Sequence, residues 1–454
     1  MEGSSGDAAT SSSLRNQVLA SICATYGGLA NGLSVGYSSP AGPDLQRSQL
    51  QLDDPQVALI GSMMPLGALF GGLACGWCME RLGRRTTMLL VSVPNVLGWL
   101  LITYAASFGP IVAGRLLTGF ATGCCTVVVP AYVGEVCEPR VRGTMGAGFQ
   151  FQATLGILIA YIIGKYVHWN SLAIACAIMV AVWAPLACLI CETPVWLLEH
   201  GRDAQALEAL QWLRGPDADV GAELKSLREQ TEHGASNKAT VMDLFNHDNR
   251  RPFVMGMMLM LLQQLSGVNA VIFYTVNIFE DAGSSIDSDL ATIIVGLVQS
   301  VSTFAAVVLV DRLGRKVLLL LSDGVMAVCL LALGVYFYME SAGTADDLGW
   351  LPLVSLMLYI FAFSIGLGPI PWLMMSELFA PEVKGAAGGI ATAFNWTLAF
   401  IVTLTFEPLV DGITEAGVFW LFAAICFGGV CYVTVFAYET KGKTLQEIQE
   451  HFRS

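Results

Sequence analysis

The sequence is short of charge. Only 13% of its 454 residues are Asp, Glu, Lys or Arg, while 55% are hydrophobic. Soluble domains carry about 25% charged residues and need that charged surface to stay dissolved. The shortage excludes a cytosolic enzyme and a disordered chain. The net charge of −13 also argues against a nucleic-acid partner, because a phosphate backbone requires a basic surface.

Histidine is scarce as well. The five histidines lie outside the apolar runs, which excludes haem ligation and a histidine proton relay within a membrane. Most of the 12 cysteines lie inside apolar runs, so an extracellular disulfide framework is not expected. No catalytic or phosphate-binding motif is present. We therefore expect no enzyme activity, no metal and no cofactor.

Long apolar segments make up most of the sequence. A membrane-spanning helix takes about 20 apolar residues. The segments lie at about 16–40, 57–78, 87–107, 110–134, 144–166, 170–191, 252–280, 290–310, 317–338, 350–376, 386–408 and 416–437. We predict an all-α membrane protein with twelve transmembrane helices in two six-helix bundles, residues 16–191 and 252–437. Tails 1–15 and 438–454 and a small intracellular helical domain at 192–251 complete the chain.

The basic residues indicate the orientation. With both termini in the cytoplasm, 20 of the 23 Lys and Arg residues lie inside, only Arg47 and Lys165 lie outside, and Arg115 lies within a span. This distribution satisfies the positive-inside rule. The external loops are acidic, which accounts for much of the net charge.

Three motifs repeat between the bundles. Glu80-Arg-Leu-Gly-Arg-Arg85 matches Asp311-Arg-Leu-Gly-Arg-Lys316, Glu135–Gly143 matches Glu377–Gly385, and Glu192-Thr193 matches Glu439-Thr440, at offsets of 231, 242 and 247 residues. The same order and similar offsets indicate two pseudo-symmetric halves. Such halves with a site between them are typical of alternating-access transporters.

The repeated charges lie at the cytoplasmic ends of helices. We expect them to form a charge lock that closes the inner mouth by ion pairs across the two bundles. The alternative is ordinary solvated loop charge. The expected members are Glu80, Arg81, Arg84, Arg85, Glu135, Arg142, Glu192, Asp311, Arg312, Arg315, Glu377, Lys384 and Glu439.

Uncharged amides are frequent inside the spans. An amide in lipid must find a partner, so these groups either hold helices together or line a wet cavity. Because amides both donate and accept hydrogen bonds, a cavity lined by them suits a sugar, and a tryptophan suits the apolar face of a sugar ring. Segment ten should break at Gly366, Gly368, Pro369 and Pro371, and the two prolines are candidate gate residues.

Five motifs resemble the sugar porters of the major facilitator superfamily. They are Gly76-Trp-Cys-Met-Glu-Arg-Leu-Gly-Arg-Arg85, Pro130-Ala-Tyr-Val-Gly-Glu135, Gln263-Gln-Leu-Ser-Gly-Val-Asn269, Gly368-Pro-Ile-Pro-Trp372 and Glu439-Thr-Lys-Gly442. Within that family the chain is most similar to the insect facilitated trehalose transporters, and next to the vertebrate facilitative glucose transporters. The resemblance implies an outer gate at Phe273 and Tyr274. It implies sugar contacts at Gln150, Gln263, Gln264, Asn269, Gln299, Trp372 and Asn395.

The resemblance also bears on coupling. Proton-coupled relatives carry an aspartate in their first span, but residues 17–41 contain no acid. Downhill transport of trehalose is therefore expected, with a hexose as the alternative. Asp323 is the one carboxylate within a span that could couple transport to protons, and a proton-coupled symporter is the less favoured alternative. Val195 stands where the family has an arginine that would add a lock contact. A sugar receptor is disfavoured by the short tails. We expect a monomer in the plasma membrane, or alternatively in an endosomal or lysosomal membrane.

Overall fold

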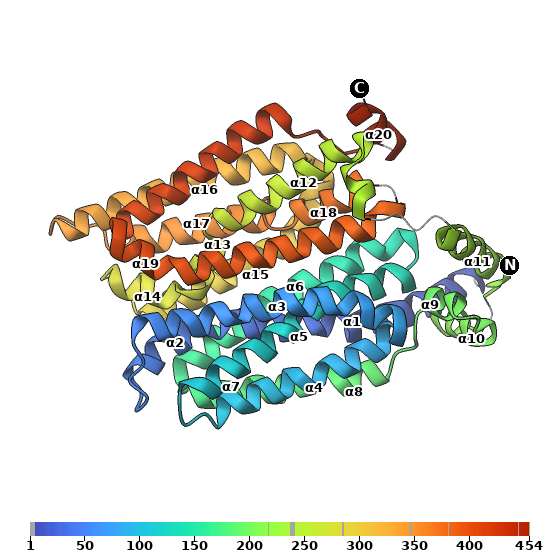
Figure 1. The fold of residues 1–454 in the computed structure, drawn as a ribbon, viewed down its shortest axis with the longest axis horizontal. Coiled ribbons are helices and arrows are strands. Elements are labelled where there is room, and N and C mark those ends of the chain that lie inside the picture. Colours follow the sequence, from blue (N-terminus) through green and yellow to red (C-terminus); the bar gives the residue numbers. More distant parts are fainter. Residues whose placement is uncertain are drawn as a thin grey trace.

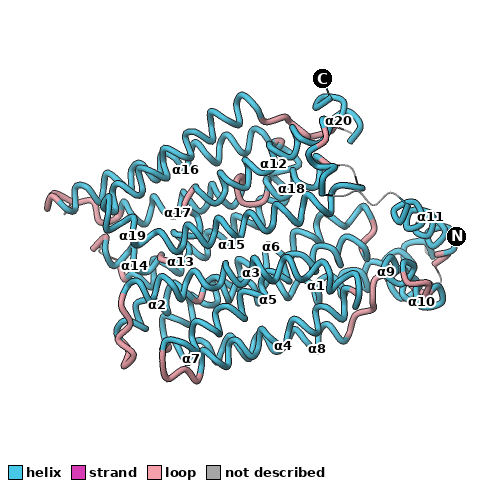
Figure 2. The backbone as a smooth tube through the Cα atoms, viewed as in Figure 1, coloured by secondary structure: helices cyan, strands magenta, loops and turns pink. Residues whose placement is uncertain are grey.

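The computed structural model describes residues 5–453 apart from 217, 237–240, 284, 285, 346, 380 and 444. At some further positions, Asp311 among them, the side chain lies outside the described part. The regular structure of the described residues is helical, and loops are short and lie mostly at the ends of the bundle (Figure 2). Eleven helical stretches in this part of the chain are long and apolar enough to cross a membrane.

The last of these stretches contains two spans. Val383–Phe436 has 54 residues, which as one straight helix would be about 80 Å long, well over twice the roughly 30 Å of a bilayer core. Thr414 interrupts it with φ 67° and ψ 162°. The prediction of an all-α protein with twelve spans is therefore confirmed.

The N-terminal half comprises eight helices. They are α1 (Ser5–Gly36), α2 (Ser38–Arg47), α3 (Asp54–Leu82), α4 (Arg84–Thr103), α5 (Phe108–Val136), α6 (Pro139–Tyr166), α7 (Trp169–Ala181) and α8 (Trp183–Cys188). Together α1 and α2 make the first span, and α7 and α8 make the sixth. Because α1 begins at Ser5, the expected free tail is helical from that residue.

The C-terminal half has more breaks. It comprises α12 (His247–Leu265), α13 (Val268–Phe273), α14 (Thr275–Asp281), α15 (Ser288–Leu313), α16 (Arg315–Ser341), α17 (Leu351–Ile365), α18 (Ile370–Leu378), α19 (Pro381–Phe436) and α20 (Leu445–Arg453). Segment ten is broken between α17 and α18, where the glycines and prolines predicted a break. Segment seven is also broken, at Gly267, whose φ of +88° suits glycine.

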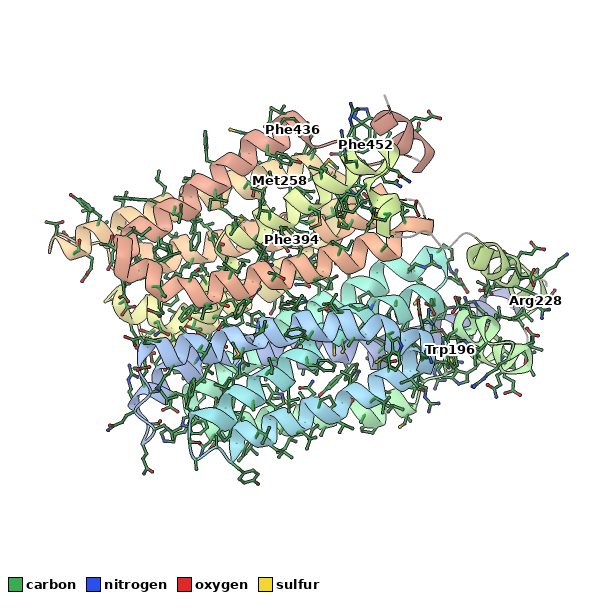
Figure 3. The ribbon with its side chains drawn as sticks, viewed as in Figure 1. Trp196, Arg228, Met258, Phe394, Phe436 and Phe452 are labelled. Atoms are coloured by element: carbon green, nitrogen blue, oxygen red, sulfur yellow. The ribbon has the colours of Figure 1, made fainter. Side chains whose placement is uncertain are left out.

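The two halves lie side by side in Figure 1. They pack through α3 against α19 and α6 against α15, and Phe151 and Phe304 meet edge to face across the second contact. Large apolar side chains such as Phe436 project from the outer surface of the bundle (Figure 3). An apolar surface of this kind suits contact with lipid.

A group of short helices caps one end of the N-terminal half. They are α9 (Pro194–Glu199), α10 (Asp203–Arg214) and α11 (Gly221–Ser236), and η1 (Val241–Phe245) leads into the second half. Arg214 docks them by donating to the Val136 carbonyl at 3.0 Å and pairing with Glu223 at 2.7 Å. Trp196 and Arg228 mark this end in Figure 3. We call it the inner end of the molecule, and the opposite end, with α2 and α14, the outer end (Figure 1).

Candidate functional site

Four of the expected sugar-contacting amides form one hydrogen-bonded chain in the C-terminal half. Asn269 on α13 donates to Gln264 on α12, which donates to Asn395 on α19 at 3.0 Å. Asn395 donates to Gln263 at 2.8 Å. Gln263 donates to the carbonyls of residues 367 and 368, at 2.9 and 2.8 Å, in the break between α17 and α18. We call this set the amide chain.

The break in segment seven places these side chains. Gln263 and Gln264 end α12, and the turn at Gly267 brings Asn269, five residues later, back onto Gln264. Gln263, Gln264 and Asn395 are buried, whereas Asn269 is half-buried. Asn269 is therefore the end of the chain that a ligand can reach.

The other three expected contacts are not members of the amide chain. Gln150 is exposed on α6 of the opposite half, and Gln299 is buried on α15. Trp372, on α18, has 39% of its surface exposed. Their contact with a sugar stays a prediction.

Segment seven has a second break, between α13 and α14, and the expected outer-gate residues lie there. The Tyr274 hydroxyl donates to the Thr403 carbonyl at 3.1 Å, and its ring stacks on Phe406 at 4.9 Å between centroids. Phe273 and Tyr274 are buried and line a small cavity together with Tyr37 and Val57 of the other half. Their position is consistent with an outer gate, and the gating itself stays a prediction.

Among the described residues, four polar contacts join the two halves at the outer end. Each ends on one stretch of the C-terminal half, residues 272–287. They are Tyr161 to the Ile272 carbonyl at 2.8 Å, the Val276 amide to Ser39 at 3.1 Å, Arg47 to Glu280 at 2.8 Å, and Lys165 to Asp287 at 2.7 Å. The only two basic residues expected on this face, Arg47 and Lys165, thus both bridge the halves.

These contacts also shape the acidity of the outer face. The hydrogen bond from Lys165 holds the pKa of Asp287 below its ordinary value. Burial, together with the neighbouring charge of Glu280, raises the pKa of Asp281. The two carboxyls therefore titrate in different ranges although they lie six residues apart.

The repeated charges at the inner end pair within each half. In the N-terminal half Arg84 pairs with Glu135 at 2.8 Å, and Glu192 accepts the backbone amides of Arg84 and Arg85 at 2.9 and 3.1 Å. Those amides begin α4, so the Glu192 carboxylate caps the helix and complements its dipole. Gly83 makes room for it, since a Cβ there would lie 2.3 Å from that carboxylate.

The C-terminal half repeats this arrangement. Arg315 pairs with Glu377 at 2.8 Å, and Glu439 accepts the backbone amides of Arg315 and Lys316 at 3.0 and 2.9 Å. Gly314 has φ +94°, close to the +91° of Gly83. The structural reason for the repeated Gly and Glu is therefore helix capping, which the sequence did not indicate.

The other expected members of the charge lock are scattered. Arg142 donates to the Cys137 carbonyl, and Arg85 to the Ala187 and Cys188 carbonyls. Those that are exposed are Glu80, Arg81, Arg142, Arg312 and Lys384, and the Asp311 side chain lies outside the described part. The structure shows ion pairs inside the halves, and a lock across the halves stays a prediction for another conformation.

Arg115 is a fully buried charge in the N-terminal half. Its guanidinium donates to the Ser34 carbonyl and the Ser38 hydroxyl, both at 2.7 Å, and to the Ile60 carbonyl at 3.4 Å. It also lies 5.5 Å from the centre of the Tyr37 ring. These partners are neutral oxygens and an aromatic face, which hold the charge without a carboxylate.

Several of these features were missed in the sequence. The break at Gly267, the bond from Tyr161 and the surroundings of Arg115 have no local signal, because their partners are far away along the chain. The outer ion pairs had a partial signal, since Arg47 and Lys165 stand out as the two bases among many acids.

The chain resembles known proteins over nearly its whole length. A model of the family described as sugar (and other) transporters matches residues 20–452. A facilitated trehalose transporter of Polypedilum vanderplanki is 44% identical over 440 residues, which cover 95% of this chain and 87% of the relative. One of Culex quinquefasciatus is 42% identical over 441 residues, covering 96% and 85%.

The fold also matches solved structures. The proton:xylose symporter XylE bound to 6-bromo-6-deoxy-D-glucose aligns with a TM-score of 0.80 and 24% identity, covering 96% of this chain and 99% of that one. At this identity the match establishes the fold alone. It agrees with the two six-helix halves described above.

Proposed function

The chain belongs to the sugar (and other) transporter family, and on that premise we propose that it carries trehalose down its concentration gradient by alternating access. The observation that supports this most is the amide chain, because it gathers four hydrogen-bonding side chains at helix breaks inside the membrane domain. Relatives over 40% identical are named trehalose transporters, which favours trehalose over a hexose.

The amide chain offers a sugar its half-buried end. Asn269 uses one hydrogen of its amide for Gln264, so its carbonyl oxygen and its second N–H can serve sugar hydroxyls. Trp372, on the helix that follows the break, supplies an aromatic face for the apolar side of a ring. Gln150 would complete the site from the opposite half.

The surroundings of Arg115 favour transport without a proton. In a proton-coupled carrier a carboxylate beside this arginine could gain and lose a proton. Here the partners are oxygens of Ser34, Ser38 and Ile60, which do not titrate near neutral pH. The buried charge is thus compensated the same way at every physiological pH.

The arrangement of the halves supports alternating access. The outer end is held closed by the four polar contacts on residues 272–287. At the inner end Arg142 on α6 and Lys384 on α19 are exposed. We assign the structure to an inward-open step, in a monomer in the plasma membrane with the inner end in the cytoplasm.

Uptake into liposomes tests the proposal. Purified protein should equilibrate labelled trehalose with saturation and without accumulation above the outside concentration. A protonophore should have no effect. Competition by glucose, fructose and maltose separates trehalose from a hexose as the preferred substrate, and protein that moves no sugar would contradict the proposal.

The end of the amide chain gives a sharper test. Asn269→Ala should raise the KM for trehalose roughly fivefold or more, because a buried amide loses its partner. Gln230→Ala, on the exposed face of α11, is the matched control and should leave KM unchanged. An unaltered KM in Asn269→Ala would remove that residue from the site.

Proton-coupled transport is the second candidate, and it rests on Asp323. This carboxylate on α16 has 1% of its surface exposed, and neither of its oxygens has a hydrogen-bond partner among the residues that the structure describes. An intramembrane acid of this kind is a candidate proton site. Accumulation of sugar driven by a pH gradient, and its loss in Asp323→Asn, would favour this candidate over the uniporter.

A further inference from the structure

We propose that Asn395 is a positioning residue, and that the helix break between α17 and α18 fixes the direction of every hydrogen bond in the amide chain. The resemblance implied a sugar contact at this position. The inference rests on the proposed function, because it concerns how the side chains of the sugar site are held in their orientations.

The direction is set at the break. Gln263 donates through Nε2 to the carbonyls of Leu367 and Gly368. In a continuous helix the Leu367 carbonyl would accept from residue 371, but Pro371 has no N–H to give. Since carbonyl oxygens only accept, the nitrogen of Gln263 must face them and its oxygen must face the other way.

Each following amide then has one possible orientation. The oxygen of Gln263 requires a donor, so Asn395 presents Nδ2 at 2.8 Å. The oxygen of Asn395 is left to accept from Gln264 at 3.0 Å, and the oxygen of Gln264 accepts from Asn269. Turning over Gln263, Asn395 or Gln264 would set like atoms against each other on both sides of that amide.

Asn395 occupies the middle of the amide chain. Only 4% of its surface is exposed, and its Nδ2 also lies 3.4 Å from the sulfur of Met260. Its polar atoms are therefore engaged by protein, and it acts on the sugar through its neighbours. Asn269, at the reachable end, presents the carbonyl oxygen to the ligand.

The amide chain connects the sugar site to α18, a helix that bears a candidate gate residue. The accepting carbonyls lie just before α18, which carries the candidate gate residue Pro371 and the expected sugar contact Trp372. A movement of α18 that withdraws these carbonyls removes what holds Gln263 in its orientation. The remaining amides are then free to turn, and the affinity of the site for a sugar hydroxyl falls.

Asn395→Asp tests this assignment through pH. The ionised acid cannot donate to Gln263, whereas the protonated acid can donate to Gln263 and accept from Gln264, as the asparagine does. We expect the KM of Asn395→Asp for trehalose to be roughly ten- to a hundredfold above that of the unmodified protein at pH 8. It should return toward that value at pH 5, in liposomes with equal pH on both sides.

Two variants serve as controls. Asn170→Asp makes the same change at the exposed start of α7 and should follow the unmodified protein at every pH. Asn395→Leu cannot donate or accept and should be impaired equally from pH 5 to pH 8. An Asn395→Asp protein that is unimpaired, or impaired equally at both pH values, would overturn the proposal, since the two forms of the acid have the same shape.

Thermal unfolding separates this inference from the proposed function. The melting temperature of Asn395→Asp, relative to the unmodified protein, should be lower at pH 8 than at pH 5 whether or not sugar is carried. If the unmodified protein fails to transport sugar, the proposed function is refuted. The melting temperatures still show whether Asn395 holds the amide chain in one orientation. A difference in melting temperature that does not vary with pH would overturn the positioning role of Asn395.

Discussion

Removing one outer ion pair should shift the protein toward an outer-open state. One Arg47 nitrogen lies 2.8 Å from both oxygens of Glu280. The side chains are 67% and 33% exposed, and such pairs contribute about 0.2–1 kcal/mol. Since the pair joins the halves only while the outer end is closed, Arg47→Gln should raise the outer-open population by up to about fivefold.

The labelling rate of a cysteine in the outer cavity measures that population. Val57 lines this cavity, and a Val57→Cys background is similar in size. An impermeant thiol reagent added outside should label it up to about fivefold faster in Arg47→Gln and in Glu280→Gln. The double variant should equal either single one, and high salt should shrink the effect.

Two outcomes would refute this reasoning. One is additive effects of the Arg47 and Glu280 substitutions, because additivity means that the residues act independently. The other is an increase in labelling that survives 1 M salt, because an exposed pair is screened at that concentration.

Two further predictions concern backbone conformation and pH. Gly83→Ala should lower stability by about 1–3 kcal/mol in thermal unfolding, because φ +91° with ψ 166° is accessible essentially to glycine alone. Gly428→Ala, where an added Cβ meets no atom within 4 Å, is the control, and equal melting temperatures would contradict the account. Lys165 lowers the pKa of Asp287. Their ion pair therefore stabilises the closed outer end at pH values above the ordinary Asp pKa of about 4, and this stabilisation is lost as the pH falls through the lowered pKa. The difference in uptake between Lys165→Gln and the unmodified protein should therefore stay constant from pH 8 to 5.5, and a change near neutral pH would count against the pair.

The sequence predicts the spans well because hydrophobicity is a local property. The break before α18 was also predictable, since proline fits the first turn of a helix but not its interior, so Pro369 and Pro371 indicate the start of a new helix. The break at Gly267 was not, because a single glycine is tolerated inside a helix. What requires glycine there is a positive φ together with the Phe422 ring, which an added Cβ would meet at 2.5 Å, and Phe422 lies 155 residues away along the chain.

The composition of the site was predictable, but its connections were not. The residue types of the amide chain were expected, yet Asn395 lies more than 130 residues from Gln263 and Gln264. Which amide donates to which depends on carbonyls exposed by a distant helix break. For the same reason the repetition of Glu192 and Glu439 was visible in the sequence while their role as helix caps was not.

The buried charge of Arg115 should make a carrier of neutral sugar sensitive to voltage. With the outer end closed, the membrane potential drops mainly across that end, where the guanidinium is held by Ser34 and Ser38. When the outer end opens, water brings the outside potential to Arg115 and the drop moves inward. One charge crossing the whole field gains about 2.3 kcal/mol per 100 mV, so a fraction of this energy favours the outer-closed state at a negative inside potential. A voltage step without sugar should therefore produce a transient current that Arg115→Gln lacks.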